Sequence, residues 1–179
     1  MIAAQVSLPR TRYQSEAQLR QFHERVLERL ASTPAVASAG VVSVLPLSGS
    51  DTDTSFSIEG RPLPTSRAEE PVAWFRIVSR DYFKTMAIAV EHGRGFLDTD
   101  RRESPCVVTI NRALAGRYWQ GQKAIGARLS VMGRSCEVVG VVADIHHHGP
   151  ATPPEPEMYL SMHQRPLRGG SIVVRAAST

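Results

Sequence analysis

The stretch Val138-Val139-Gly140-Val141-Val142-Ala143-Asp144 is an apolar run that contains one glycine and ends in an acid. A similar run, Val107-Val108-Thr109-Ile110-Asn111, precedes it. Continuous β-branched runs bounded by charged or turn residues are typical of strands that are buried on both faces. A glycine inside such a strand indicates a bulge or the close approach of another backbone. The two runs therefore predict the buried centre of a sheet.

The first 45 residues predict a strand, a helix and a second strand. Residues 3–8 alternate apolar and polar side chains, as a half-buried strand does. Ser15 and Gln18 have the spacing of a capping box, so we expect a helix from there to Thr33. Residues 36–45 are rich in valine and small residues and predict the second strand. This order is a βαβ unit, in which the two strands can run parallel.

The composition changes to Ser, Gly and Asp between Pro46 and Asp53, which indicates a surface loop and a subdomain boundary. A proline-rich segment, residues 146–156, indicates the point at which the chain returns from the inserted subdomain to the first one. We expect an α+β fold in which residues 1–48 and 155–179 form a porter-like βαβ subdomain and residues 49–154 form an inserted, mixed α/β subdomain. Further strands are expected at 56–59, 72–78, 128–131, 158–162 and 171–175, and short helices at 79–86 and 111–119.

Composition excludes several classes of protein. The chain has 179 residues, of which 42% are hydrophobic and 21% charged, so we expect a folded globular domain. The net charge is +4, and the arginines are spread along the whole chain, whereas nucleic-acid binders cluster their basic residues. No apolar run approaches the roughly eighteen residues that cross a bilayer, and the N-terminus does not resemble a signal peptide. We therefore expect no nucleic-acid partner and no membrane span within the sequence given.

Cys106 and Cys136 are the two cysteines, each at the start of an expected strand. Two cysteines alone do not define a metal site. An oxidising compartment would allow them to pair if neighbouring strands brought their Cα atoms within about 7 Å. We expect two buried thiols, with a disulfide as the alternative, because free cysteine is among the most buried residue types.

The segment Asp144-Ile145-His146-His147-His148 is the most enzyme-like feature, because imidazoles bind zinc, copper or nickel. On an extended chain, consecutive side chains point to opposite sides, so His146 and His148 could share a metal while His147 faces away. No fourth ligand is evident in the sequence. We expect a solvated loop, and we assign no catalytic, cofactor-binding or metal-binding residue. The alternative is a metal-dependent hydrolase that uses His146 and His148.

Other short motifs lack the context that their chemistry requires. The run Ser48-Gly49-Ser50-Asp51 has no nucleophile-elbow pattern. Gly93-Arg94-Gly95 lacks the remaining residues of a phosphate loop and predicts a tight turn. Asp98 and Asp100 lack the other ligands of a calcium loop and are expected to be exposed. The aromatic pairs at positions 82–83 and 118–119 are expected in the core.

Taken in order, these landmarks resemble the MacB-like periplasmic core domain of FtsX-type ABC transporter permeases. The resemblance runs over essentially the whole chain and is nearest to the multi-copy permeases of soil bacteria such as acidobacteria. It is carried by Val6-Ser7-Leu8-Pro9, Arg29-Leu30 before a Pro34-x-Val36 turn, Leu45-Pro46-Leu47-Ser48-Gly49, residues 56–61, Ser79-Arg80-Asp81-Tyr82-Phe83, Gly93-Arg94-Gly95-Phe96, residues 111–119, Ile125-Gly126 and residues 138–144.

The resemblance implies an extracytoplasmic domain of an inner-membrane permease, placed between its first and second membrane helices. Its implied role is to transmit ATP-driven motion of those helices to a substrate or partner, without catalysis and without a cofactor. The implied partners are the membrane helices of the same permease and an ABC ATPase, with a second permease copy or a periplasmic adaptor as further candidates. The porter-like part lacks the family's C-terminal helix and strand, so we expect it to be truncated. We expect the isolated chain to be monomeric. A stand-alone periplasmic ligand-binding module is the other alternative.

Overall fold

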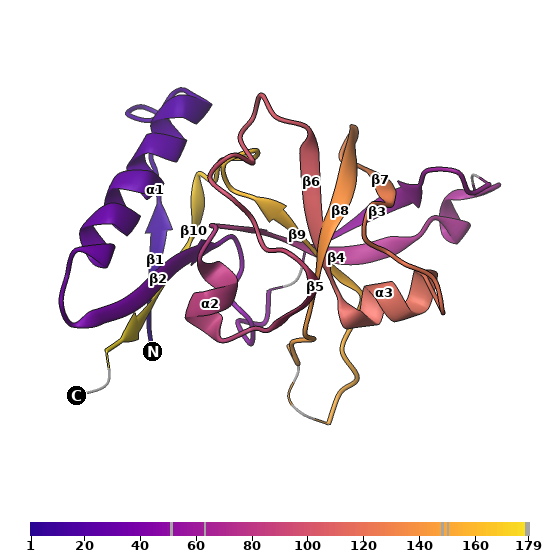
Figure 1. Ribbon diagram of the computed structural model, residues 1–179. Coiled ribbons are helices and arrows are strands. Elements are labelled where there is room, and N and C mark those ends of the chain that lie inside the picture. The colour runs from indigo at the N-terminus through magenta and orange to yellow at the C-terminus, as the bar shows by residue number, and fades with distance from the viewer. Residues whose placement is uncertain (51, 63, 148, 150, 178–179) are drawn as a thin grey trace.

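The computed structural model describes residues 1–50, 52–62, 64–147, 149 and 151–177 (Figure 1). Its first elements are strand β1 (Ile2–Ser7), helix α1 (Glu16–Ala31) and strand β2 (Val36–Val42). The expected capping box begins α1, because the side chain of Ser15 accepts from the Gln18 backbone N–H and the Gln18 side chain accepts from that of Ser15. Strand β10 (Gly169–Ala176) pairs antiparallel with both β1 and β2, so β1 and β2 run parallel to each other with β10 between them.

The remaining elements form the larger part of the fold. The strands of this part are β3 (Asp53–Ile58), β4 (Val72–Val78), β5 (Val90–Gly93), β6 (Cys106–Asn111), β7 (Arg128–Val131), β8 (Arg134–Val142) and β9 (Glu157–Ser161). The described strands pair into one 10-stranded sheet in the order β1-β10-β2-β4-β3-β7-β8-β6-β9, with β5 paired to β8 and a further pairing of β4 with β9. The helices are η1 (Arg67–Glu69), α2 (Tyr82–Met86) and α3 (Arg112–Tyr118).

The two apolar runs that predict the centre of the sheet are β6 and β8, which lie side by side in parallel (Figure 1). Every residue of β6 is buried. The register between these strands shifts after Val108, so that Thr109 lies opposite Gly140. A Cβ atom at Gly140 would lie 2.1 Å from the carbonyl oxygen of Arg94. Both interpretations of this glycine, a bulge and a close backbone approach, are confirmed.

The larger part has cores on both faces of its sheet. One contains Ile110, Leu114 of α3 and Leu129. The other contains Val142 and the aromatic residues of α2, Tyr82 and Phe83, which were expected in the core. The α+β fold class is confirmed by the mixture of short helices with a large, mainly antiparallel sheet.

Strand pairing bears on the expected subdomains without testing their boundaries. β10 joins β1 and β2, whereas β9 pairs with β4 and β6. Residues 155–179 therefore supply one strand beside β1 and β2 and one strand inside the larger part. The division into residues 1–48 with 155–179 and residues 49–154 stays a prediction.

Candidate functional site

The connection between two groups of strands is the shortest strand pairing of the sheet. We call β1, α1, β2 and β10 the α1 part, and β3 to β9 with α2 and α3 the β4 part. The α1 part and the β4 part meet where β2 pairs with β4, and this pairing has one register pair, Val42 with Val78. Two backbone hydrogen bonds flank it, from Ser43 N–H to the Ile77 carbonyl at 2.9 Å and from Ser79 N–H to the Val41 carbonyl at 3.0 Å. The sheet is therefore at its narrowest here.

Two serine side chains extend this short ladder. The hydroxyl of Ser79 accepts from Val41 N–H at 2.9 Å, and the hydroxyl of Ser43 accepts from Ile77 N–H at 3.0 Å. The Ser79 side chain therefore hydrogen-bonds to β2. Asp81 occupies the N-cap position of α2 without a side-chain capping bond. The two serine hydroxyls accept from backbone N–H groups on either side of the register pair, so the polar contacts between the two segments extend beyond the backbone ladder.

Helix α2 packs against the same junction. A Cβ atom at Gly40 of β2 would lie 2.9 Å from the Cα atom of Tyr82, so only glycine allows this approach. From β10, the Nε–H of Arg175 donates to the carbonyl oxygen of Thr85 at 2.8 Å. Figure 1 shows α2 beside β2 and β10. This helix belongs to the β4 part but rests on two strands of the α1 part.

Polar contacts bridge the gap between α1 and the β4 part. His163 Nδ1 lies 3.3 Å from a carboxylate oxygen of Glu24, and Arg102 forms an ion pair with Glu16. Burial lowers the pKa of His163, and the negative charge of Glu24 offsets part of that effect. A cavity of about 410 Å³ separates α1 from residues 79–81 and 98–101. The exposed pair of Arg102 and Glu16 can break and re-form at little cost, because water can replace each partner.

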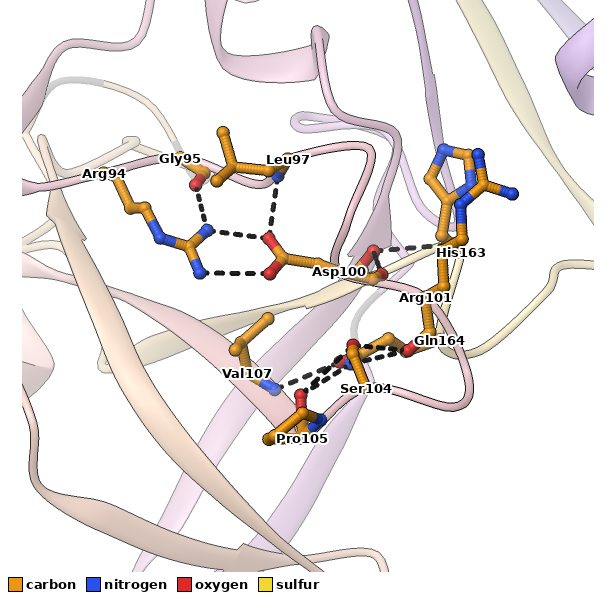
Figure 2. Close-up of polar contacts among 11 residues, drawn as sticks. Arg94, Gly95, Leu97, Asp100, Arg101, Ser104, Pro105, Val107, His163 and Gln164 are labelled. Carbon is orange, nitrogen blue, oxygen red and sulfur yellow. Dashed lines mark hydrogen bonds and ion pairs between the residues drawn. The ribbon is translucent and has the colours of Figure 1, made fainter.

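The loop that faces α1 is itself held firmly, as Figure 2 shows. Both guanidinium NH groups of Arg94 donate to Asp100, at 2.7 and 3.0 Å, and the same carboxylate accepts from Leu97 N–H at 2.7 Å. The bond to Asp100 raises the pKa of Arg94. Asp100 is buried, so the expectation of an exposed acid is wrong for this residue, whereas Asp98 is exposed and pairs with Arg80. Asp100 therefore holds the loop in its conformation by binding Arg94 and the backbone of Leu97.

Gln164 fixes the far end of the same loop. Its side-chain oxygen accepts from Val107 N–H at 3.0 Å, and its amide nitrogen lies within 3.1 Å of the carbonyl oxygens of Arg101 and Pro105 and the Ser104 hydroxyl (Figure 2). A buried amide that satisfies several backbone groups costs stability when it is lost. Gln164 therefore ties the loop that faces α1 to the start of β6.

The histidine segment is only partly the solvated loop that its sequence predicts. His146 is exposed, and its Nδ1 lies 3.0 Å from the Thr152 carbonyl oxygen. His147 is buried between Arg76 and Glu157, so the expectation of a solvated loop is wrong for this residue. His148 lies outside the described residues, as does Asp51 of the serine motif. Asp144 accepts from Ala113 N–H at 2.8 Å and so caps α3.

The surroundings of His147 form a buried, charge-balanced cluster. Arg76 donates to the Nδ1 of His147 at 3.0 Å, so the proton of this imidazole lies on Nε2, which donates to Glu157 at 3.0 Å. Glu157 also pairs with Arg76 and accepts from the Tyr159 hydroxyl at 2.6 Å. Each charged group faces its partner and is closed to solvent, so the cluster can hold β4, β9 and the histidine loop together but leaves no open ligand position.

Metal-binding groups do not converge elsewhere in the described ranges: no three His, Cys, Asp or Glu side chains there could hold a metal ion. That the chain binds no metal natively stays a prediction. Within the same ranges, no helix combines the length and apolar character that a membrane span requires.

Comparison with known proteins gives the family. The sequence matches the model of the MacB-like periplasmic core domain over residues 3–179. The chain belongs to this family. The resemblance drawn from the ordered landmarks is confirmed, and this is the periplasmic domain type of MacB-like ABC transporter permeases. A comparison with curated proteins finds no match.

Solved structures agree with the fold of a MacB-like domain. The periplasmic region of MacB from Actinobacillus actinomycetemcomitans is 14% identical with a TM-score of 0.61, covering 87% of this chain and 64% of that one. The extracellular domain of the noncanonic ABC-type transporter YknZ from Gram-positive bacteria is 15% identical with a TM-score of 0.57, covering 87% of this chain and 73% of that one. The chain thus spans 64% of the MacB periplasmic region.

The cysteines of this MacB-like domain correct a further expectation. Cys106 and Cys136 form a disulfide, where two buried thiols were expected. They are register partners at the start of the parallel strands β6 and β8, with Cα atoms 4.3 Å apart. The sequence placed both at strand starts but could not give the register.

Sequence reasoning also missed the polar residues that organise this MacB-like domain. Arg76 and Glu157 lie in strands that are otherwise mostly apolar, and Gln164 follows β9. Arg76 inside the expected strand 72–78 was the available signal, because buried charges require partners. Glu157 lies just before the expected strand 158–162, so the sequence carried no such signal for it. The identity of each partner depends on how the strands pair.

Proposed function

We propose that this domain is a non-catalytic transmitter of motion in an ABC permease. In this proposal, ATP-driven displacement of membrane helices moves the α1 part against the β4 part, and the movement reaches a substrate or partner outside the membrane. The observation that carries the proposal is the narrow junction, at which Val42 and Val78 are the single register pair between β2 and β4. Across it, exposed or half-exposed pairs such as Arg102 with Glu16 can exchange partners with water.

The disulfide supports an extracytoplasmic location for the domain. Disulfides form and persist in oxidising compartments and are rare in the cytosol. Ile2 of β1 lies opposite Val174 of β10, so the two ends of the described chain leave from one side of the fold (Figure 1). This arrangement suits a domain carried between two membrane helices. The proposed partners are those helices and an ABC ATPase, with a second permease copy or an adaptor as further candidates.

Distance measurements between spin labels in the parent permease test the proposal. Gln21 on α1 and Gln122 in the β4 part are both exposed. Labelled cysteines at these two positions should report a distance that changes by more than about 2 Å between the nucleotide-free and ATP-bound states. The native cysteines will not react with the label, because they are bonded to each other.

A second pair of labels supplies the control. Gln122 and Ser130 are exposed and both belong to the β4 part, so their distance should be the same in the two states. Unchanged distances for both pairs would contradict transmission through this junction. A change in both pairs would show deformation inside the β4 part instead of motion at the junction.

A further inference from the structure

A cavity of about 570 Å³ lies between the start of α1, the starts of β6 and β8, and the segment after β9. The disulfide lines it, together with the apolar side chains of Val131, Met132 and Leu160. Its volume is in the range of sites that hold small molecules, roughly 300–1,000 Å³. The cavity therefore has the size of a binding site, and its lining combines an apolar patch with charged and polar groups.

The charged groups around this cavity are mostly positive. Three arginines line it, and the single lining acid is Glu16; the arginines are Arg102, Arg134 and Arg165. Glu16 is already engaged in its ion pair with Arg102. Within the described part of the chain, the guanidinium groups of Arg134 and Arg165 have neither an ion pair nor a hydrogen bond. Two positive charges at the cavity are thus unbalanced.

The other polar groups at the cavity are committed to the protein. Gln164 uses its side-chain oxygen and nitrogen on the backbone of the loop before β6. The hydroxyl of Ser161 accepts from His163 N–H at 3.2 Å. Arg134 is positioned by the tight hairpin between β7 and β8, in which Met132 and Gly133 both have positive φ. The free donors at the cavity are therefore guanidinium groups.

We propose that this cavity binds a small organic anion with an apolar tail. The carboxylate of such a ligand would accept charge-assisted hydrogen bonds from Arg134 and Arg165, and the tail would contact the disulfide and the apolar side chains. An arginine fork matches a planar carboxylate better than a single ammonium does. Binding of this ligand does not depend on the proposed transmission of motion, so either proposal can fail alone.

Calorimetric titration of the full chain with decanoate tests this site. We expect saturable 1:1 binding that weakens as salt rises. Arg134→Gln and Arg165→Gln should each weaken it about three- to tenfold. Glu16→Gln removes the one lining acid and frees Arg102, so it should strengthen binding. Arg10→Gln is the matched control, because Arg10 is exposed and does not line the cavity, and it should leave affinity unchanged.

Two other probes separate the parts of the proposal. Inorganic phosphate, which has charge but no apolar tail, should bind at least about tenfold more weakly than decanoate. Decyl maltoside, which has an apolar tail but no charge, should not displace bound decanoate. Absence of saturable decanoate binding would overturn the proposal. So would equal affinities in the wild type and in a folded Arg134→Gln/Arg165→Gln double variant, with folding checked by the thermal unfolding midpoint.

Discussion

Arg76 of β4 and Glu157 of β9 form an ion pair in which each side chain is only 1% exposed. The two residues are 81 positions apart in the sequence and meet because β4 and β9 pair in parallel. His147 and Tyr159 occupy remaining hydrogen-bonding positions of this pair. The burial of two charges is tolerated because each compensates the other, so removing one leaves a penalty on its partner.

Glu157→Gln should therefore destabilise the fold strongly. We expect the free energy of unfolding to fall by about 3–5 kcal/mol, because Arg76 would stay buried without a counter-charge. Urea denaturation measures the change. Glu59→Gln is the control, since Glu59 pairs with Arg128 at 3.3 Å on the surface and should matter much less. Equal losses in the two variants would mean that burial of the pair is unimportant.

Two buried tyrosines should respond differently to loss of the hydroxyl. Tyr159 donates to Glu157, whereas the Tyr82 hydroxyl has no partner among the described residues. We expect Tyr159→Phe to cost about 1.5–3 kcal/mol and Tyr82→Phe to change stability by less than about 0.5 kcal/mol. Parallel urea titrations compare them. A larger loss for Tyr82→Phe would reveal a partner for that hydroxyl.

The same tyrosines predict a loss of stability in alkali. Burial raises the pKa of Tyr82 and of Tyr159, and the negative charge of Glu157 adds to both shifts. Their contribution is fully present below the unfolded pKa of about 10 and is lost as the pH rises towards the folded value. The free energy of unfolding should fall above about pH 10, and less steeply in the Tyr82→Phe/Tyr159→Phe double variant. Identical pH profiles would assign the alkaline loss to other groups.

The disulfide should contribute to stability and resist thiol reagents. Replacing both cysteines with alanine should cost about 3–4 kcal/mol, because the bridge closes a loop with a sequence separation of 30. Denaturation of the double variant measures this. Mass spectrometry after alkylation of the unfolded, unreduced protein should find no modified cysteine. Two alkylated cysteines in protein made in an oxidising compartment would refute the bond.

Two glycines provide a matched pair of alanine substitutions. Gly140→Ala should destabilise by more than about 2 kcal/mol, because the new Cβ would meet the Arg94 carbonyl oxygen at 2.1 Å. Gly116→Ala in α3 has open space around it and should stabilise by about 0.5–1 kcal/mol through helix propensity. Thermal unfolding should move the two midpoints in opposite directions. An unchanged or raised midpoint for Gly140→Ala would contradict the close approach of β8 to residue 94, and a lowered midpoint for Gly116→Ala would contradict the open space around that residue.

The sequence by itself determined the local elements and the family. β6 and β8 follow from continuous β-branched runs, and α1 follows from its capping box and apolar face, because these patterns act between residues that are neighbours along the chain. The order of the landmarks was sufficient to place the chain among MacB-like domains.

Only the tertiary structure decided which residues meet. Cys106 faces Cys136 because of the register between β6 and β8, and Asp100 is buried because Arg94 lies across the same loop. His147 is enclosed because β4 and β9 bring Arg76 and Glu157 to it. Local patterns give the period of an element, but they do not encode register or strand order. Those depend on packing between segments far apart in sequence, where each buried polar group must find its partner.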